Sequence, residues 1–303
     1  MTTLRGSAAA AGLRGPNAAA ATEKAAVLAE ALPYIRRFWG KVVVVKYGGS
    51  AMEDPALASL FAQDVVLMRS VGMRPVVVHG GGPQIGALMA RLGMVPEFRD
   101  GFRVTDADTL DVARMVLVGK VNRDIVSAVN VLAPMAVGLS GEDAGLILAT
   151  ARDPELGFVG DVVHVNPSII ERLMVEELIP VIATIGSDAE GQAYNINADV
   201  AAAAIAAALG AEKLVYLTDV AGLLADVRDP SSLVQTLTVD ELDRWLAGEG
   251  GPVSGGMIPK LASCARAVRG GVAQAHILDG RVPHALLLEV FTNEGIGTMI
   301  GPA

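Results

Sequence analysis

An apolar run that ends directly in three glycines limits what this chain can fold into. Residues 75–78 are Pro-Val-Val-Val, and His79 and the glycines 80–82 follow, with a helix-like segment at 83–92. The run predicts a buried strand that opens into a tight loop, where the missing Cβ atoms let the backbone approach a ligand. A strand, a glycine loop and a helix N-terminus in succession present N–H groups to an anion.

Two further segments place a lysine beside glycines. The apolar run 41–47 carries Lys46 near its end and continues into Gly48-Gly49, and Lys260 follows a glycine pair at 255–256. Taken alone, each lysine is typical of a solvated surface residue. Beside glycine loops, however, an ammonium group acts as a point charge for phosphate oxygens. Glycine loops with lysines therefore predict a phosphoryl-transfer site.

Other enzyme classes with glycine-rich loops lack support in this sequence. His-Gly-Gly-Gly also occurs in the oxyanion loop of lipase-like hydrolases, but no serine here lies in a Gly-x-Ser-x-Gly elbow. The chain has no Gly-x-x-x-x-Gly-Lys-Ser/Thr loop, and Ile85 breaks the Gly-x-Gly-x-x-Gly spacing of dinucleotide-binding folds.

Composition restricts the partners and the compartment. With 303 residues, 52% of them hydrophobic, the chain can bury a large core in one or two domains. A net charge of −9 argues against nucleic acid or an anionic membrane as the main partner. The one cysteine, Cys264, excludes an internal disulfide and fits a reducing compartment. No apolar run reaches membrane-spanning length, and we expect a cytoplasmic protein.

Strand-like and helix-like segments alternate along most of the chain, which predicts an α/β fold with a largely parallel sheet covered on both faces. The predicted strands are 41–47, 75–80, 136–140, 146–151, 161–166, 180–186, 213–219, 274–280 and 286–291. The predicted helices are 56–70, 83–92, 106–132, 167–178, 198–209, 238–247 and 257–270. The strands at 146–151 and 161–166 are expected to form an antiparallel hairpin added to the sheet. Thr238 and Glu241 predict a capping box.

The N-terminal region divides into two parts. Residues 1–22 are rich in Ala and Gly, which is typical of a disordered leader, although a short transit peptide is an alternative. Residues 23–40 predict a helix kinked at Pro33. It carries an apolar stripe, Leu28, Leu32, Ile35 and Trp39. The stripe packs either on its own domain or on another subunit.

Polar residues gather at the start of the alanine-rich helix 198–209. Asn195, Asn197 and Asp199 alternate along the chain, so an extended segment places them on one side. One of them is expected to cap the helix. The three exceed what a cap needs, and the acid is suited to hold two lysines in position.

Two other segments add candidate ligand contacts. Arg103 is a candidate clamp for a carboxylate, with a surface ion pair as the ordinary alternative. Thr218 and Asp219 follow the strand at 213–219, where an open α/β sheet binds ligands, although an ordinary polar turn fits this segment as well. A boundary between two lobes is predicted near 187–195.

Together these motifs resemble those of the amino acid kinase family, over roughly residues 25–302. The resemblance rests on Lys46-Tyr47-Gly48-Gly49-Ser50, His79-Gly80-Gly81-Gly82, Gly101-Phe102-Arg103-Val104-Thr105, Tyr194-Asn195-Ile196-Asn197-Ala198-Asp199, Thr218-Asp219-Val220 and Gly255-Gly256-Met257-Ile258-Pro259-Lys260. It implies a three-layer αβα sandwich. It also implies transfer of the γ-phosphoryl group of ATP to the side-chain carboxylate of N-acetyl-L-glutamate, a step of arginine biosynthesis. Mg²⁺ would be held mainly by the nucleotide phosphates, with no metal site in the protein.

The resemblance also implies roles for individual residues. Lys46 and Lys260 would stabilise the transition state, Asp199 would orient them, and Gly49 and Gly81 would donate N–H groups to the transferring phosphoryl. Residues 41–190 would form the amino-acid-binding lobe, with its substrate held by Gly81, Gly82, Arg103 and Asn195. Residues 191–303 would form the nucleotide-binding lobe, and the nucleotide contacts would be Lys46, Gly48, Thr218, Asp219, Gly222, Leu223 and Lys260.

Two segments resemble the arginine-inhibited, hexameric branch of that family. These are the N-terminal helix and the C-terminal segment 288–299. By this resemblance the chain would assemble as a trimer of dimers and would bind L-arginine as an inhibitor through Tyr34, His276, Glu289 and Gly295. The alanine-rich leader departs from the family pattern.

Two alternative functions remain at this stage. Another amino acid kinase, acting on aspartate or carbamate, would share the phosphoryl-transfer residues. A catalytically silent arginine sensor would not need both lysines and Asp199, which this chain retains.

Overall fold

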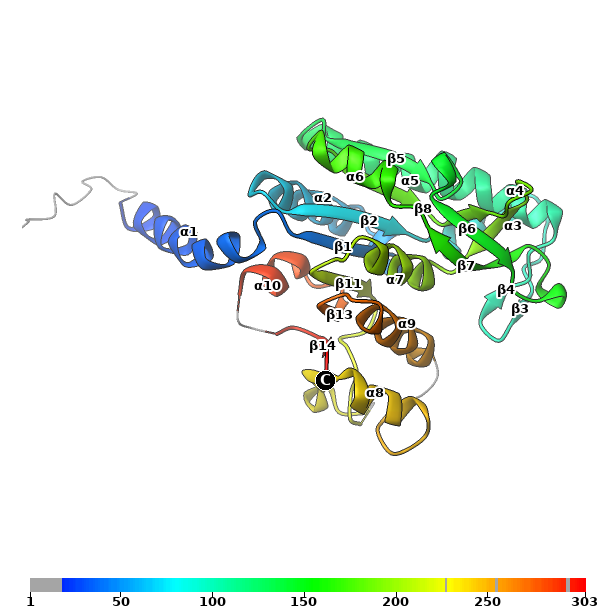
Figure 1. Cartoon of the computed structure of the whole chain (residues 1–303). Coiled ribbons are helices and arrows are strands. Elements are labelled where there is room, and N and C mark those ends of the chain that lie inside the picture. Colours follow the sequence, from blue (N-terminus) through cyan, green and yellow to red (C-terminus); the bar gives the residue numbers. More distant parts are fainter. Residues whose placement is uncertain (1–17, 227, 254–255, 293–294) are drawn as a thin grey trace, which may run out of the picture.

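Eight strands form the central sheet of this protein in a computed structural model, which describes residues 18–226, 228–253, 256–292 and 295–303 (Figure 1). In spatial order they are β12 (Thr236–Thr238), β14 (Thr298–Gly301), β13 (Gln274–Asp279), β11 (Lys213–Thr218), β1 (Val42–Tyr47), β2 (Arg74–His79), β8 (Ile179–Ala183) and β5 (Ala136–Ser140). All neighbouring pairs run parallel except β13 with β14. The predicted largely parallel sheet is confirmed.

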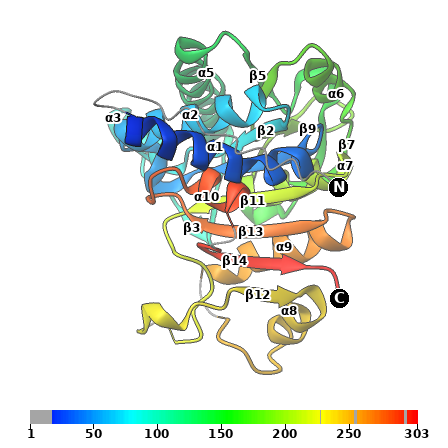
Figure 2. The ribbon, with the colours of Figure 1, turned by 90° about the vertical axis from the view of Figure 1, so that its left-hand side faces the viewer.

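Helices cover both faces of this sheet, because its central strands are apolar on both sides. Val43 and Val45 pack with α2, α5 and α10, whereas Val44 packs with α7 and α9 on the opposite face. Figure 2 shows α1, α2 and α10 on one side of the sheet and α9 on the other. The helices are α1 (Ala18–Phe38), α2 (Pro55–Ser70), α3 (Gly82–Arg91), α4 (Ala107–Arg114), α5 (Asn122–Leu132), α6 (Ser168–Val175), α7 (Ala198–Ala208), α8 (Val239–Leu246), α9 (Met257–Arg269) and α10 (Ala285–Phe291). The predicted three-layer αβα sandwich is confirmed.

The predicted hairpin pairs as expected, but it does not extend the central sheet. Its strands, β6 (Ile147–Ala151) and β7 (Val159–Val165), join β9 (Ile185–Ser187) and β10 (Ala193–Ile196) in a small closed barrel. The chain leaves β8 at Thr184 and continues directly into β9, which supplies a new edge for the hairpin. The polar segment 188–192, near the predicted lobe boundary, connects β9 to β10.

The predicted strand at 286–291 is wrong. This segment forms α10, because Leu286 and Val290, four residues apart, are both buried, as on one face of a helix. The edge position is filled instead by β14 and β12, which the sequence did not predict. The Thr238–Glu241 capping box at α8 is present, with both reciprocal hydrogen bonds.

The long helix predicted at 106–132 is divided into three parts. A π-helical segment, η2 (Met115–Val121), separates α4 from α5. Short 3₁₀ turns occur at η1 (Gly49–Met52), η3 (Asp143–Gly145), η4 (Pro154–Leu156) and η5 (Pro230–Ser232). A two-stranded ribbon, β3 (Phe98–Arg99) with β4 (Phe102–Arg103), was not predicted.

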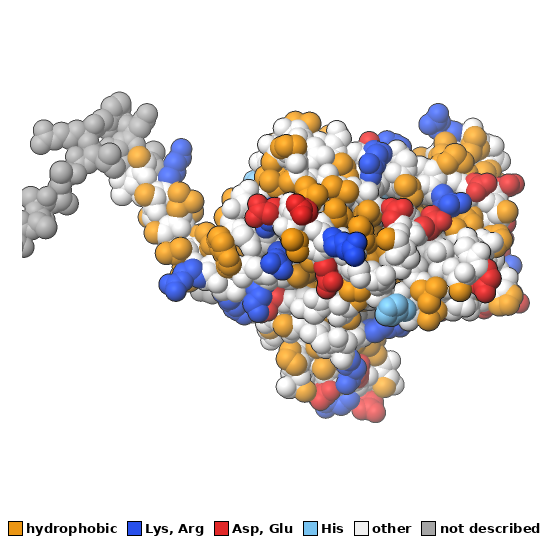
Figure 3. All heavy atoms as spheres, turned by 45° about the horizontal axis from the view of Figure 1, so that its top comes forward, with side chains coloured by type: hydrophobic (Ala, Val, Ile, Leu, Met, Phe, Trp, Pro, Cys, Tyr) orange, Lys and Arg blue, Asp and Glu red, His pale blue; other side chains and the backbone are white. Residues whose placement is uncertain are grey.

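Helix α1 extends away from the body of the protein (Figures 1 and 3). It begins at Ala18, before the predicted start at 23, and continues through Pro33. Leu28 and Leu32 are 71% and 54% exposed, so this part of the stripe does not pack on its own domain. Residues 1–17 of the predicted leader lie outside the described residues. Among the described helices, none has the length and apolar character needed to cross a bilayer.

Candidate active site

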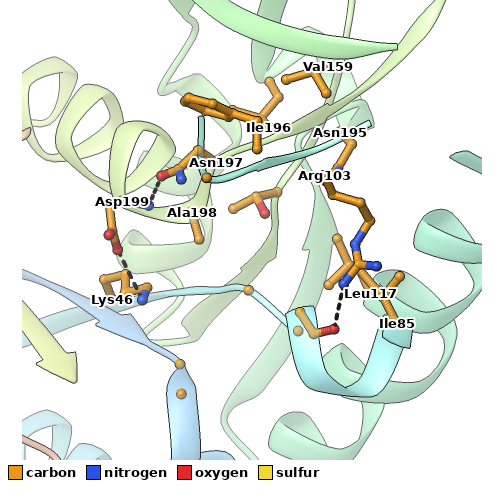
Figure 4. Close-up of a pocket in the computed structure, with 18 of the residues that line it drawn as sticks. Lys46, Ile85, Arg103, Leu117, Val159, Asn195, Ile196, Asn197, Ala198 and Asp199 are labelled. Atoms are coloured by element: carbon orange, nitrogen blue, oxygen red, sulfur yellow. Dashed lines mark hydrogen bonds and ion pairs between the residues drawn. The ribbon is translucent and has the colours of Figure 1, made fainter. Parts of the chain in front are cut away.

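A cavity of about 300 Å³ lies where the two glycine loops leave β1 and β2. Figure 4 shows Lys46 at the end of β1 facing Asp199 at the start of α7, with Arg103 on the opposite side of the cavity. Every predicted catalytic and amino-acid-binding residue lines this cavity: Lys46, Gly49, Gly81, Gly82, Arg103, Asn195, Asp199 and Lys260. The structure thus brings together residues that are far apart in the sequence.

Asp199 lies between the two predicted catalytic lysines. Its carboxylate oxygens are 3.0 Å from Lys46 Nζ and 2.9 Å from Lys260 Nζ. Burial alone would raise the pKa of Asp199, but the two ammonium groups outweigh this and hold the pKa below its ordinary value. The cluster therefore carries two ammonium groups against one carboxylate, which leaves positive charge for an anionic ligand.

The start of α7 explains the alternation of polar residues. Asn197 is the N-cap, and its side-chain oxygen accepts hydrogen bonds from the backbone N–H groups of Asp199 and Val200 at 2.9 and 3.2 Å. The cap leaves the Asp199 side chain free to pair with the lysines. The prediction that one of the polar residues caps the helix is confirmed.

Gly48, Gly49 and Gly81 have close contacts or a backbone conformation that disfavours a side chain, whereas a Cβ atom on Gly82 would meet nothing within 4 Å. A Cβ atom on Gly48 would lie 2.9 Å from Lys46 Nζ, and one on Gly81 would lie 2.7 Å from Leu117 Cδ2. Gly49 has a φ of +74°, which disfavours other residues. Leu117 belongs to the π-helical segment η2, so this irregular turn packs directly on the glycine loop.

His79 supports the glycine loop from inside the protein. Its Nε2 lies 3.1 Å from the amide nitrogen of Asn122, which is a donor, so Nε2 accepts and Nδ1 donates to the Gly80 carbonyl at 3.0 Å. Burial lowers the pKa of His79 to about 4, so the imidazole is neutral near pH 7. It is fully buried, and its contacts are structural.

Arg103 and Asn195 form the other side of the cavity. The Arg103 guanidinium donates to the Gly82 carbonyl at 3.0 Å, contacts Met89 Sδ at 3.3 Å and lies over the Phe98 ring. These contacts hold the guanidinium over the glycine loop. Among the described residues, no Asp or Glu forms an ion pair with Arg103. Asn195 is held by Thr105. A carboxylate bound in the cavity can therefore accept from Arg103.

A second cavity, of about 350 Å³, adjoins the first at Lys260. Asp219, Gly222 and Leu223 line it, together with the start of α9. Thr218 is buried at the end of β11, and its hydroxyl donates to Asp219. Because Lys260 lines both cavities, its ammonium group lies where ligands in the two cavities would meet.

The four residues predicted to bind arginine line a third cavity, of about 280 Å³, at the opposite end of the strands. These residues are Tyr34, His276, Glu289 and Gly295. Glu289 Oε1 lies 2.9 Å from Lys213 Nζ and 2.8 Å from His276 Nδ1. Burial would raise the pKa of Glu289, but these neighbours lower it overall. Burial lowers the pKa of His276, and its buried Nε2 has no hydrogen-bonding partner among the described residues.

The described residues offer no cluster of three or more His, Cys, Asp or Glu side chains that could hold a metal ion. The acid nearest the transferring group, Asp199, is already paired with two lysines. Asp219 in the second cavity is the remaining predicted residue able to contact a cation. This donor set fits a magnesium ion that is carried by nucleotide phosphates.

Several functional residues were not predicted. Asn122, Leu117 and Lys213 act on the predicted residues from distant parts of the chain. A lysine that begins a strand and an asparagine inside a helix are common, so no sequence pattern indicates their roles. Gly255, part of the third glycine–lysine element, lies outside the described residues.

Comparison with known proteins agrees with this geometry. The acetylglutamate kinase of Acidothermus cellulolyticus is 55% identical over 290 residues, which cover 92% of this chain and 97% of that protein. Two structures of the N-acetylglutamate synthase of Neisseria gonorrhoeae also match 92% of this chain. The one with coenzyme A and N-acetyl-glutamate has a TM-score of 0.80 at 28% identity, and the one with coenzyme A and L-arginine has a TM-score of 0.75 at 27% identity. This chain spans 63% and 65% of those synthase chains. A sequence model of the amino acid kinase family matches residues 41–279, and this chain therefore belongs to the amino acid kinase family.

Proposed function

We propose that this chain is an acetylglutamate kinase, which transfers the γ-phosphoryl group of ATP to the side-chain carboxylate of N-acetyl-L-glutamate in arginine biosynthesis. The observation that carries the proposal is the Lys46–Asp199–Lys260 cluster between two cavities. Phosphoryl transfer needs mainly positioning and neutralisation of charge, which two lysines held by one carboxylate supply. The 55% identical acetylglutamate kinase supports the choice of substrate.

The acceptor binds in the cavity that contains Arg103 and Asn195. Arg103 holds the α-carboxylate of N-acetyl-L-glutamate through two parallel hydrogen bonds, which a guanidinium forms well. The side-chain carboxylate then points toward Lys46 and the N–H groups of Gly49 and Gly81. It is already ionised near pH 7, so the reaction needs no general base. The neutral, fully buried His79 is consistent with this.

ATP binds in the adjoining cavity, with its adenosine part near Asp219, Gly222 and Leu223 and its phosphates toward Lys260. Mg²⁺ accompanies the nucleotide and neutralises phosphate charge. Residues 41–190 then form the amino-acid-binding lobe and residues 191–303 the nucleotide-binding lobe. With its one cysteine, Cys264, buried and unpaired, the enzyme is suited to the reducing conditions of the cytoplasm.

The test is a coupled assay for ADP release with ATP and Mg²⁺, in which N-acetyl-L-glutamate, L-glutamate, L-aspartate and carbamate are compared as acceptors. We expect turnover with N-acetyl-L-glutamate to exceed that with the others by at least tenfold. Preferred turnover of aspartate or carbamate would identify another amino acid kinase. No turnover with any acceptor, in a folded protein, would favour a catalytically silent sensor.

We further propose that L-arginine inhibits the enzyme by binding in the third cavity. His276 Nε2 and the second oxygen of Glu289 are acceptors that suit a guanidinium, and Tyr34 contributes from α1. The synthase structure with coenzyme A and L-arginine, matched over 92% of this chain, supports a role for arginine in related proteins. Inhibition requires that arginine bind one state of the enzyme better than another.

We propose that α1 joins subunits into a hexamer, a trimer of dimers. Leu28, Leu32 and Trp39 are 71%, 54% and 67% exposed, which is costly for one apolar stripe on an isolated helix. Figure 3 shows hydrophobic side chains along the extended helix α1. Burial against the same stripe of another subunit would stabilise the contact by several kcal/mol at ~25 cal/mol per Å². Symmetric exchange of such contacts closes a ring.

Removal of residues 1–39 tests both proposals together. We expect active dimers by light scattering, with greatly weakened inhibition by arginine, because Tyr34 and the stripe are lost. The double substitution Leu28→Glu with Leu32→Glu should give the same assembly state while Tyr34 remains, and Lys24→Glu on the same helix is the control. A truncated protein that stays hexameric and fully inhibited by arginine would contradict both proposals.

A further inference from the structure

Tyr216 is a buried polar side chain on the strand next to Lys46, beneath the helices that carry Asp199 and Lys260. It is in β11 and is completely buried. In the parallel pairing of β11 with β1, Tyr216 is the direct partner of Lys46. Paired residues of neighbouring strands point to the same face of a sheet, so the ring lies beneath α7 and α9, which carry Asp199 and Lys260.

The Tyr216 hydroxyl reaches the first turn of α7. It donates a hydrogen bond of 3.0 Å to the backbone carbonyl of Asp199. In an α-helix this carbonyl also accepts from the N–H group four residues later, so the hydrogen bond from the phenol adds to the helix's own hydrogen bond. Burial raises the pKa of Tyr216 well above its ordinary value, so the hydroxyl keeps its proton and remains a donor.

The same side chain also lies against α9. Tyr216 belongs to the buried cluster that contains Leu261 and Cys264 of α9. Ser263 of the same helix donates its one hydroxyl hydrogen to the carbonyl of Pro259 at 2.9 Å, the residue directly before Lys260. Tyr216 is therefore hydrogen-bonded to the turn that carries Asp199 and buried beneath the helix that carries Lys260.

We propose that Tyr216 is a positioning residue for the phosphoryl-transfer reaction, one that holds the first turn of α7 and thereby the Asp199 carboxylate between the two lysines. Tyr216 does not line the active-site cavity or the adjoining one, so it acts through these residues and not on the substrate. This inference rests on the proposed function only in the choice of acceptor for the assay.

The decisive variant is Tyr216→Phe, which removes the hydroxyl and keeps the ring in the core. We expect kcat to fall roughly tenfold, while the KM values for ATP and the acceptor stay within about twofold, because the two binding cavities are intact. The control is Tyr194→Phe, which removes a hydrogen bond of the same length, 3.0 Å to Asp188, on the polar turn between β9 and β10. The control should lose stability without losing kcat.

A second measurement separates positioning from general support of the fold. In an Asp199→Ala background, Tyr216→Phe should lower kcat by less than threefold, because the carboxylate that it positions is absent. Equal losses in both backgrounds, or an unchanged kcat in Tyr216→Phe, would overturn the inference. If Tyr216→Phe does not fold, Tyr216→Met decides, because it also lacks the hydroxyl and its flexible side chain adapts to the core. A kcat unchanged in that variant overturns the inference, and a selective loss of kcat supports it.

The assay uses whichever acceptor the wild-type protein phosphorylates fastest. Preference for an acceptor other than N-acetyl-L-glutamate would contradict the proposed function and leave the test of Tyr216 intact. An active wild-type enzyme with an unaffected Tyr216→Phe variant would contradict only the role of Tyr216.

Discussion

Two buried carboxylates, each held by basic side chains, lie at opposite ends of the same pair of strands. At the carboxyl end of β1, Asp199 lies between Lys46 and Lys260. At the beginning of β11, Glu289 contacts Lys213 and His276. Both carboxylates have a lowered pKa despite burial, because the ammonium groups at Asp199, and the hydrogen bond from His276 together with Lys213 at Glu289, outweigh the cost of desolvation.

The difference between the clusters lies in the charge that remains. The Asp199 cluster has two ammonium groups for one carboxylate. In the Glu289 cluster, burial lowers the pKa of His276, so one ammonium group matches one carboxylate and the cluster is close to neutral. The first arrangement attracts an anion such as a transferring phosphoryl group. The second can exchange one cationic partner for another, as arginine binding would require.

The largest effect should follow removal of a lysine at the first cluster. Lys46→Ala and Lys260→Ala are each expected to lower kcat by roughly 100- to 1,000-fold, about 3 kcal/mol, because each removes charge stabilisation made mainly in the transition state. Lys41→Ala, which removes an exposed ion pair with Glu212 at the start of the same strand, is the control. A variant that keeps more than a tenth of wild-type turnover would show that its lysine is not catalytic.

The matching change at the second cluster should affect stability more than turnover. Lys213→Met leaves Glu289 buried with only His276, and removal of one partner from a buried ion pair lowers the free energy of unfolding by about 3 kcal/mol. Urea denaturation and turnover of the same preparation provide the measurement. A loss of kcat as large as that of Lys46→Ala would remove the distinction drawn between the clusters.

The first cluster was predictable because glycines mark its loops. Lys46 and Gly81 each lie where a strand, glycines and a helix follow one another, and Lys260 comes just after a glycine pair at the start of a helix. Both patterns are visible in the sequence. The partners that hold these segments were not predictable. Asn122 contacts His79 across 43 positions of sequence, and the π-helical turn that carries Leu117 has no distinctive pattern.

In the fold, too, the elements that depend on contacts between distant parts of the chain were not predicted. The continuous apolar strands β1, β2 and β11 were predicted because burial on both faces gives an unmistakable run. The segment 286–291 was predicted as a strand because Leu-Leu-Leu-Glu-Val-Phe is apolar in either conformation. Only packing against α2 and α1 decides that it is helical. The closed barrel was not predicted either, because it is completed by β9 and β10, which are too short to recognise as strands in the sequence.

Acid sensitivity extends the comparison to two buried histidines, His79 under the glycine loop and His276 in the second cluster. The pKa of His79 is about 4 in the folded chain and ordinarily 6.5. Between pH 6.5 and 4 the unfolded chain therefore binds a proton at this residue that the folded chain does not. The free energy of unfolding should fall as the pH is lowered through this window, by up to about 3 kcal/mol from His79.

His79→Gln should flatten this dependence, measured as urea unfolding at intervals from pH 7 to pH 4. The variant His276→Gln changes the second cluster and should also weaken arginine inhibition, which His79→Gln should leave intact. His164→Gln, on the exposed side of β7, is the control. If His79→Gln and wild type show the same slope, the neutral, buried His79 is not a source of acid sensitivity.

The smallest effect tests how the cavity at the first cluster selects its acceptor. Arg103 and Arg37 each line a cavity, but only Arg103 lies in the first cavity, where it donates to Gly82 on the glycine loop and is proposed to hold the carboxylate of the acceptor. Arg103→Lys keeps the charge and loses the paired hydrogen bonds, so the KM for N-acetyl-L-glutamate should rise roughly tenfold and the KM for ATP by less than twofold. Arg37→Lys should leave both KM values unchanged, because its cavity lies at the opposite end of the strands. An equal rise in both KM values for Arg103→Lys, or a selective rise for ATP, would place Arg103 outside the amino-acid site.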